Sequence, residues 1–259
     1  MADGLVEKRV LITAGGAGIG RAIAGAFCAA GARVHVCDVD AEALAEAKDQ
    51  WPELGTTVTD VADSDQVDRL FDEALGALGG LDFLVNNAGI AGPTAAVEDC
   101  DLEDWRQTIA VNLDATFYCS RRAIPALKAA GGGGIVNMSS SAGLFGYALR
   151  SPYVAAKWAI IGFTKTLAME LGPHGIRANA ICPGPVAGPR MDRVIAAQTE
   201  ARGVPEQAIR DTYTRNVSLR TFIEPEDIAN GVIYLCSPMG AKVSGQAFPI
   251  DGHTESLSD

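Results

Sequence analysis

The chain has 259 residues, of which 48% are hydrophobic and 20% are charged, so it can bury a large core and is not expected to be disordered. Its formal net charge of −11 excludes the basic face that nucleic acid requires. The six cysteines form no C-x-x-C pair, and three histidines give little support to a zinc site. We therefore expect a small-molecule partner, no nucleic acid and no metal.

The N-terminal residues lead directly into an apolar strand, without the basic, apolar and small-residue order of a signal peptide. No uninterrupted apolar run reaches the length that a bilayer requires. We expect a cytoplasmic protein with reduced thiols and no membrane association.

The first strand, residues 9–13, is followed by a glycine-rich loop at 14–20, a helix at 21–30 and a second strand at 33–38. This order is a βαβ unit, in which the loop amides at the helix N-terminus favour a bound pyrophosphate. A glycine cluster alone is weak support, because tight turns also use glycine. Between two strands, the second ending in an acid, it indicates a dinucleotide site.

Asp38 ends the second strand and indicates which dinucleotide binds. A carboxylate there accepts hydrogen bonds from ribose hydroxyls and repels a 2′-phosphate, and neither Ala17 nor Val39 offers a positive charge to offset that repulsion. We therefore expect NAD rather than NADP. The alternative role, a cap for the next helix, suits Asp40 better.

Strands and helices then alternate along most of the chain. Strands are predicted at 56–61, 82–86, 135–139, 177–182 and 246–250, and helices at 64–78, 102–129 and 225–235, with Pro125 expected to kink or break the second of these. Such alternation predicts one α/β domain over residues 1–259, a doubly wound parallel sheet with helices on both faces. Ligands of such sheets bind beyond the carboxyl ends of the strands.

The region at about 185–220 departs from this alternation, with predicted helices at 191–201 and 206–216 and many arginines. We interpret it as a mobile lid over the substrate pocket. A solvated helical pair explains most of these arginines about as well.

Tyr153 and Lys157 stand four residues apart in an apolar, alanine-rich run whose spacing fits a buried helix, so both side chains should lie on one face. A cation near a phenol stabilises the phenolate and lowers its pKa, which gives a proton-transfer group for neutral pH. An isolated pair of this kind is more often an ordinary surface pair. The surrounding motifs decide between the two.

These motifs together resemble the short-chain dehydrogenase/reductase family over nearly the whole chain. The matching stretches are residues 13–20, 60–61, 86–89, Asn112, Ser140, Tyr153 with Lys157, and 183–184. The resemblance implies a Rossmann-type domain and the catalytic set Asn112, Ser140, Tyr153 and Lys157. It also implies cofactor contacts from Gly15, Gly16, Gly18, Ile19, Gly20, Asp38, Asp60, Val61, Asn87, Ala88, Gly89, Tyr153, Lys157, Pro183, Gly184 and Val186.

In the implied chemistry, Tyr153 as phenolate takes the hydroxyl proton of a secondary alcohol while a hydride moves to the nicotinamide. Ser140 holds the substrate oxygen, Lys157 lowers the Tyr153 pKa and holds the nicotinamide ribose, and Asn112 positions a water. A lone Asn inside a helix is otherwise more often a capping or kinking residue.

The chain departs from the family pattern at two positions. Ala14 replaces the first loop glycine, and we expect Gly15 and Gly16 to supply the flexibility through a shifted turn. Gly188 stands where a threonine usually contacts the nicotinamide carboxamide, so a backbone group near Val186 is expected to hold it alone.

The substrate is less well defined by the sequence. Arg150 and Arg190 suggest an anionic or hydroxyl-rich substrate, such as a polyol, a hydroxy acid or a cyclic alcohol. Family members are usually tetramers, so we expect a homo-oligomer, a tetramer or a dimer. The alternatives are an NADP-linked carbonyl or 3-oxoacyl reductase of the same family and a non-catalytic nucleotide-binding regulatory protein.

Overall fold

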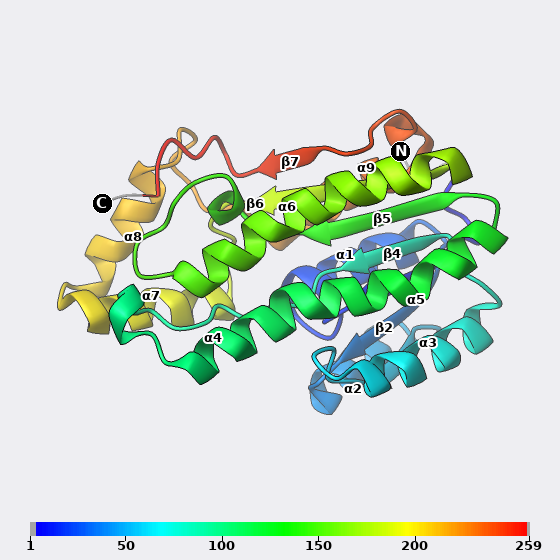
Figure 1. The fold of residues 1–259 in the computed structure, drawn as a ribbon, viewed down its shortest axis with the longest axis horizontal. Coiled ribbons are helices and arrows are strands. Elements are labelled where there is room, and N and C mark those ends of the chain that lie inside the picture. The colour runs from blue at the N-terminus through cyan, green and yellow to red at the C-terminus, as the bar shows by residue number, and fades with distance from the viewer. Residues whose placement is uncertain (1–3, 258–259) are drawn as a thin grey trace.

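Seven parallel strands form one sheet at the centre of the molecule in the computed structural model, which describes residues 4–257 (Figure 1). The strand order is β3-β2-β1-β4-β5-β6-β7, so the chain winds outward from β1 in one direction and from β4 in the other. This arrangement is the predicted doubly wound α/β fold. The predicted domain range of 1–259 also includes residues 1–3 and 258–259, which lie outside the described part of the chain.

The strands are short, and those inside the sheet are mostly buried, as expected for a parallel sheet covered on both faces, whereas the edge strands β3 and β7 are partly exposed. In β1, for example, Val10, Leu11 and Ile12 have no exposed surface. The strand bounds are β1 Arg9–Thr13, β2 Arg33–Asp38, β3 Gly55–Val58, β4 Phe83–Asn86, β5 Gly133–Met138, β6 Ile176–Pro183 and β7 Ala247–Ile250. The third strand is shorter than the predicted 56–61, because Asp60 accepts a hydrogen bond from the Ala62 amide and turns the chain.

Two layers of helices cover the sheet, each with its own hydrophobic cluster. One face carries α1 Gly18–Ala29, α2 Ala41–Gln50 and α9 Pro225–Cys236, and the other carries α3 Ser64–Leu78, α5 Ala115–Ala129 and α6 Ser151–Leu171, with α4 Leu102–Ile109 leading into α5. As predicted, Asp40 caps α2 by accepting hydrogen bonds from two backbone amides. Among residues 4–257, no helix is both long and apolar enough to span a bilayer.

The two remaining helices, α7 Pro189–Arg202 and α8 Glu206–Arg215, lie at the end of the molecule toward which the strand arrows point (Figure 1). They correspond to the helices predicted for the lid and are separated at Gly203, which has a positive φ of 65°. Arg210 of this pair forms surface ion pairs with Asp192 and Glu206. That arginine therefore fits the solvated alternative.

The break predicted at Pro125 is wrong, because α5 continues through it. Its neighbours Ala123 and Leu127 are fully buried, and this packing holds the helix in place. The irregular segment lies earlier, in a π-helical turn at Ala110–Asp114 between α4 and α5. There the Asn112 side chain donates to the carbonyl of Thr108, and such an insertion into the helical ladder is a known cause of irregularity.

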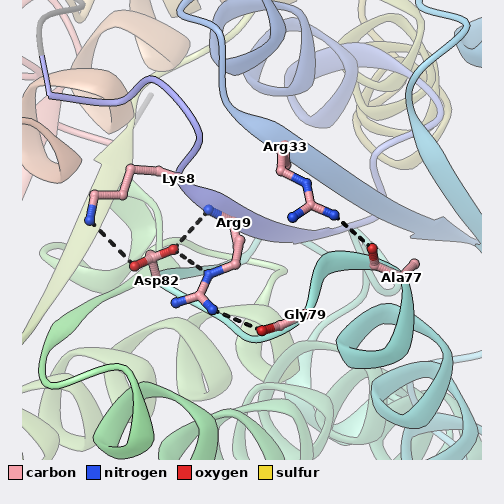
Figure 2. A network of polar contacts seen from close by, with 6 residues as sticks. All are labelled: Lys8, Arg9, Arg33, Ala77, Gly79 and Asp82. Atoms are coloured by element: carbon pink, nitrogen blue, oxygen red, sulfur yellow. Dashed lines mark hydrogen bonds and ion pairs between the residues drawn. The ribbon is translucent and has the colours of Figure 1, made fainter.

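An ionic cluster fastens the amino ends of β1 and β4, at the opposite end of the sheet from the predicted site (Figure 2). Asp82 accepts hydrogen bonds from the Arg9 backbone amide at 2.9 Å and from its Nε at 2.7 Å, and it pairs with Lys8 at 3.4 Å. Arg9 also reaches the carbonyl of Gly79, which ends α3. The cluster fixes the central strands at the end away from the chemistry.

Candidate active site

The glycine-rich loop leads into α1, which begins at Gly18, three residues earlier than predicted. Ala14 itself adopts a left-handed φ of 51°, so the predicted shift of the turn to Gly15 and Gly16 is wrong. Ala17 precedes the helix without a side-chain cap, and no acidic residue lies in the first turn. The amides at this helix N-terminus are therefore available to a bound anion.

Asn87 ties the loop to the end of β4. Its side-chain amide donates to the carbonyls of Thr13 and Ala14 at 3.1 and 3.0 Å, and the backbone amides of Asn87 and Ala88 donate to the Thr13 hydroxyl. A Cβ atom on Gly20 would lie 1.9 Å from the Ala14 carbonyl oxygen, so only glycine fits there. These contacts lie between β1 and β4, where the strand order reverses and where sheets of this kind bind ligands.

Asp38 lies half-buried at the end of β2, beside this loop. One carboxylate oxygen accepts from the Gly16 amide at 3.1 Å, and the other accepts from the Asp40 amide. Asp60 and the buried Val61 follow β3 at the same edge of the sheet, and the half-buried Ile19 lies in the first turn of α1. The structure therefore brings the predicted adenosine-side residues to one edge of the sheet.

Val186 follows Pro183 and Gly184 at the end of β6. A parallel bridge pairs Val186 with Ile223 and uses the amides of Ile223 and Ala187, so the N–H and C=O of Val186 point away from Ile223. Within residues 4–257 they have no hydrogen-bond partner. This backbone can hold a carboxamide, whereas Gly188 has no side chain to contribute.

Tyr153 and Lys157 share one face of α6, with the Lys157 nitrogen 5.5 Å from the centroid of the Tyr153 ring. The Lys157 ammonium is buried and donates to the Met138 carbonyl at 2.8 Å. The Ser140 hydroxyl lies near Tyr153 and accepts from the Ala142 amide, while its neighbour Ser139 is buried and donates to the Lys157 carbonyl. Ser139 therefore has a structural role in this position.

Burial and the surrounding charges change the pKa of both Tyr153 and Lys157. Burial alone raises the pKa of Tyr153, but the positive charges of Lys157, Arg190 and Arg150 and the nearby Ser140 hydroxyl outweigh it, and the pKa falls below its ordinary value. Burial lowers the pKa of Lys157 to about 8, opposed by the attraction of Tyr153. A phenol with a lowered pKa is suited to accept a proton near neutral pH.

Asn112 belongs to the same cluster, although it comes from a different element. A Cβ atom on Gly89 would lie 2.6 Å from Asn112 Oδ1 and 3.4 Å from the Lys157 nitrogen, so these groups face one another. Asn112 donates to the carbonyls of Ile90 and Thr108, while its Oδ1 is buried without a hydrogen-bond partner in the described chain. That oxygen can accept from a water or from the lysine.

The predicted substrate residues differ in their environment. Arg150 is only 3% exposed and lies over the rings of Tyr147 and Tyr153, whereas Arg190 is exposed and donates to the Gly89 carbonyl. Both are near enough to Tyr153 for their charges to lower its pKa.

Sequence reasoning missed a neighbouring polar cluster. The hydroxyls of Tyr147 and Tyr213 are hydrogen-bonded to each other, and Gln198 donates to both. The three residues are 15 to 66 positions apart, and no spacing pattern connects them. No group of three His, Cys, Asp or Glu side chains suitable for a metal ion occurs between residues 4 and 257.

A family model described as enoyl-(acyl carrier protein) reductase matches residues 13–253. The chain is 36% identical over 251 residues to a D-beta-hydroxybutyrate dehydrogenase of Cupriavidus necator, covering 95% of this chain and 96% of that protein. It belongs to the short-chain dehydrogenase/reductase family.

Solved structures of the family share the complete fold. An NAD⁺-bound xylitol dehydrogenase superposes with a TM-score of 0.93 at 28% identity, covering 97% of this chain and all of that one. A variant of the actinorhodin polyketide ketoreductase with NADPH gives 0.91 at 30% identity, covering 96% of this chain and 97% of that one. As a short-chain dehydrogenase/reductase, the protein is an oxidoreductase of alcohols and carbonyl compounds that uses a nicotinamide cofactor.

The glycine loop and the space beside Gly89 fit such a dinucleotide on physical grounds. The amides of the uncapped α1 suit a pyrophosphate, and a side chain at Gly89 would contact Asn112 and approach Lys157. When bound, the nicotinamide supplies a carbon that accepts or donates a hydride.

Proposed function

We propose that the protein is an NAD-dependent dehydrogenase that oxidises a secondary alcohol to its ketone and catalyses the reverse reduction. The observation that supports this most strongly is the buried Lys157 beside Tyr153, which together with Arg190 and Arg150 favours the phenolate. In oxidation, Tyr153 takes the hydroxyl proton as the carbon–hydrogen bond of the same carbon breaks. The electron pair of that bond leaves as hydride to the cofactor, and the carbonyl forms.

Ser140 has the role of holding the substrate oxygen beside Tyr153, since its side chain lies close enough to the phenol to lower the pKa of Tyr153. Lys157 also faces Gly89 and Asn112, so its remaining N–H groups are available to the nicotinamide ribose and to a water on Asn112 Oδ1. In this relay Lys157 gives up a proton through that water to solvent, and it is then able to accept the proton that Tyr153 took from the alcohol.

The proposed preference for NAD depends on Asp38. Its carboxylate is already oriented by the Gly16 and Asp40 amides, so the ribose hydroxyls of NAD meet a fixed acceptor. A 2′-phosphate would meet a negative charge at the same position, and the adjacent Val39 is apolar. All the predicted cofactor-binding residues are included in this proposal as contacts of the dinucleotide, with the Val186 backbone holding its carboxamide.

The same proposal includes α7 and α8 as the substrate lid, a cytoplasmic location and a homo-oligomer, with a tetramer as the expected form. The exposed apolar side chains Trp105, Phe117 and Trp158 on α4, α5 and α6 support an association surface.

The test is a steady-state assay of reduced cofactor with NAD and with NADP, over a panel of polyols, hydroxy acids and cyclic alcohols. We expect turnover with NAD and a catalytic efficiency with NADP at least about tenfold lower, with Asp38→Ala narrowing the difference. Equal or better efficiency with NADP favours the NADP-linked reductase instead. Nucleotide binding without turnover of any panel member favours the regulatory protein.

A further inference from the structure

Arg150 is a buried cation that forms no ion pair with a carboxylate in the described chain. Its side chain is 3% exposed, and none of the ion pairs formed within residues 4–257 includes it. One guanidinium nitrogen donates to the Ala91 carbonyl at 2.8 Å, and Nε is buried without a partner in the described chain. Burial of a charge is costly unless it is paired, so this arrangement needs an explanation.

Arg150 lies close to Tyr153, the proposed proton-transfer group. The residue directly precedes α6, and its guanidinium carbon lies 5.2 Å from the ring centroid of Tyr153. The carbonyl that it contacts belongs to Ala91, two residues after Gly89. An anion bonded to the guanidinium would therefore lie only a few carbon atoms from an alcohol held at Tyr153.

The charges facing Tyr153 are all positive. Lys157 comes from α6, Arg190 from α7 and Arg150 from the turn before α6, and among residues 4–257 no carboxylate contributes to the shift of the Tyr153 pKa. This local excess is unusual in a chain with a net charge of −11. It favours a substrate that brings a negative charge.

Hydrogen bonds from α7 and α8 hold the tyrosine that packs behind Arg150. The guanidinium also lies 5.7 Å from the centroid of the Tyr147 ring, and the Tyr147 hydroxyl is bonded by Gln198 of α7 and Tyr213 of α8. Gln198 is itself 3% exposed. The two lid helices thus fix the tyrosine that packs on Arg150, which keeps its donors oriented for a ligand.

We propose that Arg150 anchors a carboxylate of the substrate, and that the enzyme therefore acts on hydroxy acids and the corresponding oxo acids rather than on neutral alcohols. A guanidinium suits this role because it binds a carboxylate through two parallel hydrogen bonds and stays charged throughout. Arg190, which is solvated, adds positive potential at the mouth of the same site. The inference rests on the proposed dehydrogenase function and specifies its substrate class.

The experiment compares each acid with its neutral amide, using lactate with lactamide and 3-hydroxybutanoate with 3-hydroxybutanamide. We expect the wild type to prefer the acid of at least one pair in kcat/KM. Arg150→Gln should reduce that acid-to-amide ratio by about 100-fold, and Arg150→Lys should restore part of it. Arg210→Gln, which removes a surface-paired guanidinium of α8, should leave the ratio unchanged.

The acid-to-amide ratio of kcat/KM distinguishes a residue that binds the substrate carboxylate from one that only positions Tyr153. If Arg150 acts only through Tyr153, Arg150→Gln lowers turnover of acid and amide equally and moves the pH profile to higher pH, and the inference is overturned. It is also overturned if neutral alcohols are oxidised and no acid is preferred. Failure of every acid and alcohol with either cofactor contradicts the proposed function itself.

Discussion

Replacing Ala14 by glycine should stabilise the protein, although the substitution removes a methyl group. Ala14 sits in the left-handed region with φ of 51°, in the first turn of the cofactor loop. Its conformation is fixed from outside, because the Asn87 side chain binds the carbonyls of Thr13 and Ala14. A close contact with Gly20 prevents relaxation of the turn.

The magnitude follows from two opposing effects. A left-handed conformation costs a residue with a Cβ atom roughly 1–2 kcal/mol, which glycine avoids. The greater conformational freedom of glycine in the unfolded chain reduces this gain in stability by about 0.4–1 kcal/mol. The net expectation is about 1 kcal/mol of added stability, or a rise in Tm of about 2–4 °C for a domain of this size.

Urea unfolding of the cofactor-free protein measures this directly, with the change read as a shift of the midpoint at constant slope. Ala45→Gly is the matched control, because Ala45 is exposed within α2 and the same change there should destabilise by about 1 kcal/mol. If Ala14→Gly is neutral or destabilising while the control behaves as expected, the reasoning about strain at Ala14 is wrong.

Two predictions concern pH. Lys157→Ala should move the rising limb of kcat/KM for oxidation to higher pH, because the loss of the cation disfavours the Tyr153 phenolate; an unmoved limb in the pH-rate profile contradicts this. His35 is buried, and burial lowers its pKa from 6.5 to about 4, so the folded state stays neutral where the unfolded chain takes up a proton. Stability should therefore fall by about 3 kcal/mol as pH drops from 6.5 to about 4, and urea unfolding of His35→Gln should show a smaller loss over that window.

The periodicity of the sequence predicted several elements to the residue. The bounds of β1, β2 and α3 agree, because continuous apolar runs define the strands and Asp63 caps α3 with its carboxylate. Local signals of this kind depend on neighbours in the chain, and they are visible without the fold. Strand–helix alternation predicted a doubly wound parallel sheet, and the structure adds that the strand order reverses between β1 and β4.

Features that depend on tertiary contacts could not be predicted from local sequence patterns. The π-helical turn contains Asn112, whose side chain contacts Ile90 from another segment, while Pro125 gave a misleading local signal. Ala14 keeps its strained φ because of Asn87, 73 residues away. The cluster of Tyr147, Gln198 and Tyr213 exists only because α7 and α8 fold back onto the loop before α6.

The sequence predicted more of the candidate site than of these tertiary details, because the site residues lie at the carboxyl ends of strands or on one face of α6. The structure brings Ser140, Tyr153 and Lys157 together, and Asn112 joins them across Gly89. The unpaired state of the Arg150 charge could not be foreseen, since it depends on which acids lie nearby in the fold.

The proposed mechanism depends most on Tyr153 as the proton-transfer group, and the direct measurement is kcat for NAD reduction by the Tyr153→Phe protein with the best alcohol of the panel. Phenylalanine keeps the ring over which Arg150 and Lys157 lie and removes only the hydroxyl. Loss of a positioned acid–base group predicts a fall in kcat of about 10³-fold with the fold intact. A Tyr153→Phe protein with kcat within about threefold of wild type would contradict the mechanism proposed for this site.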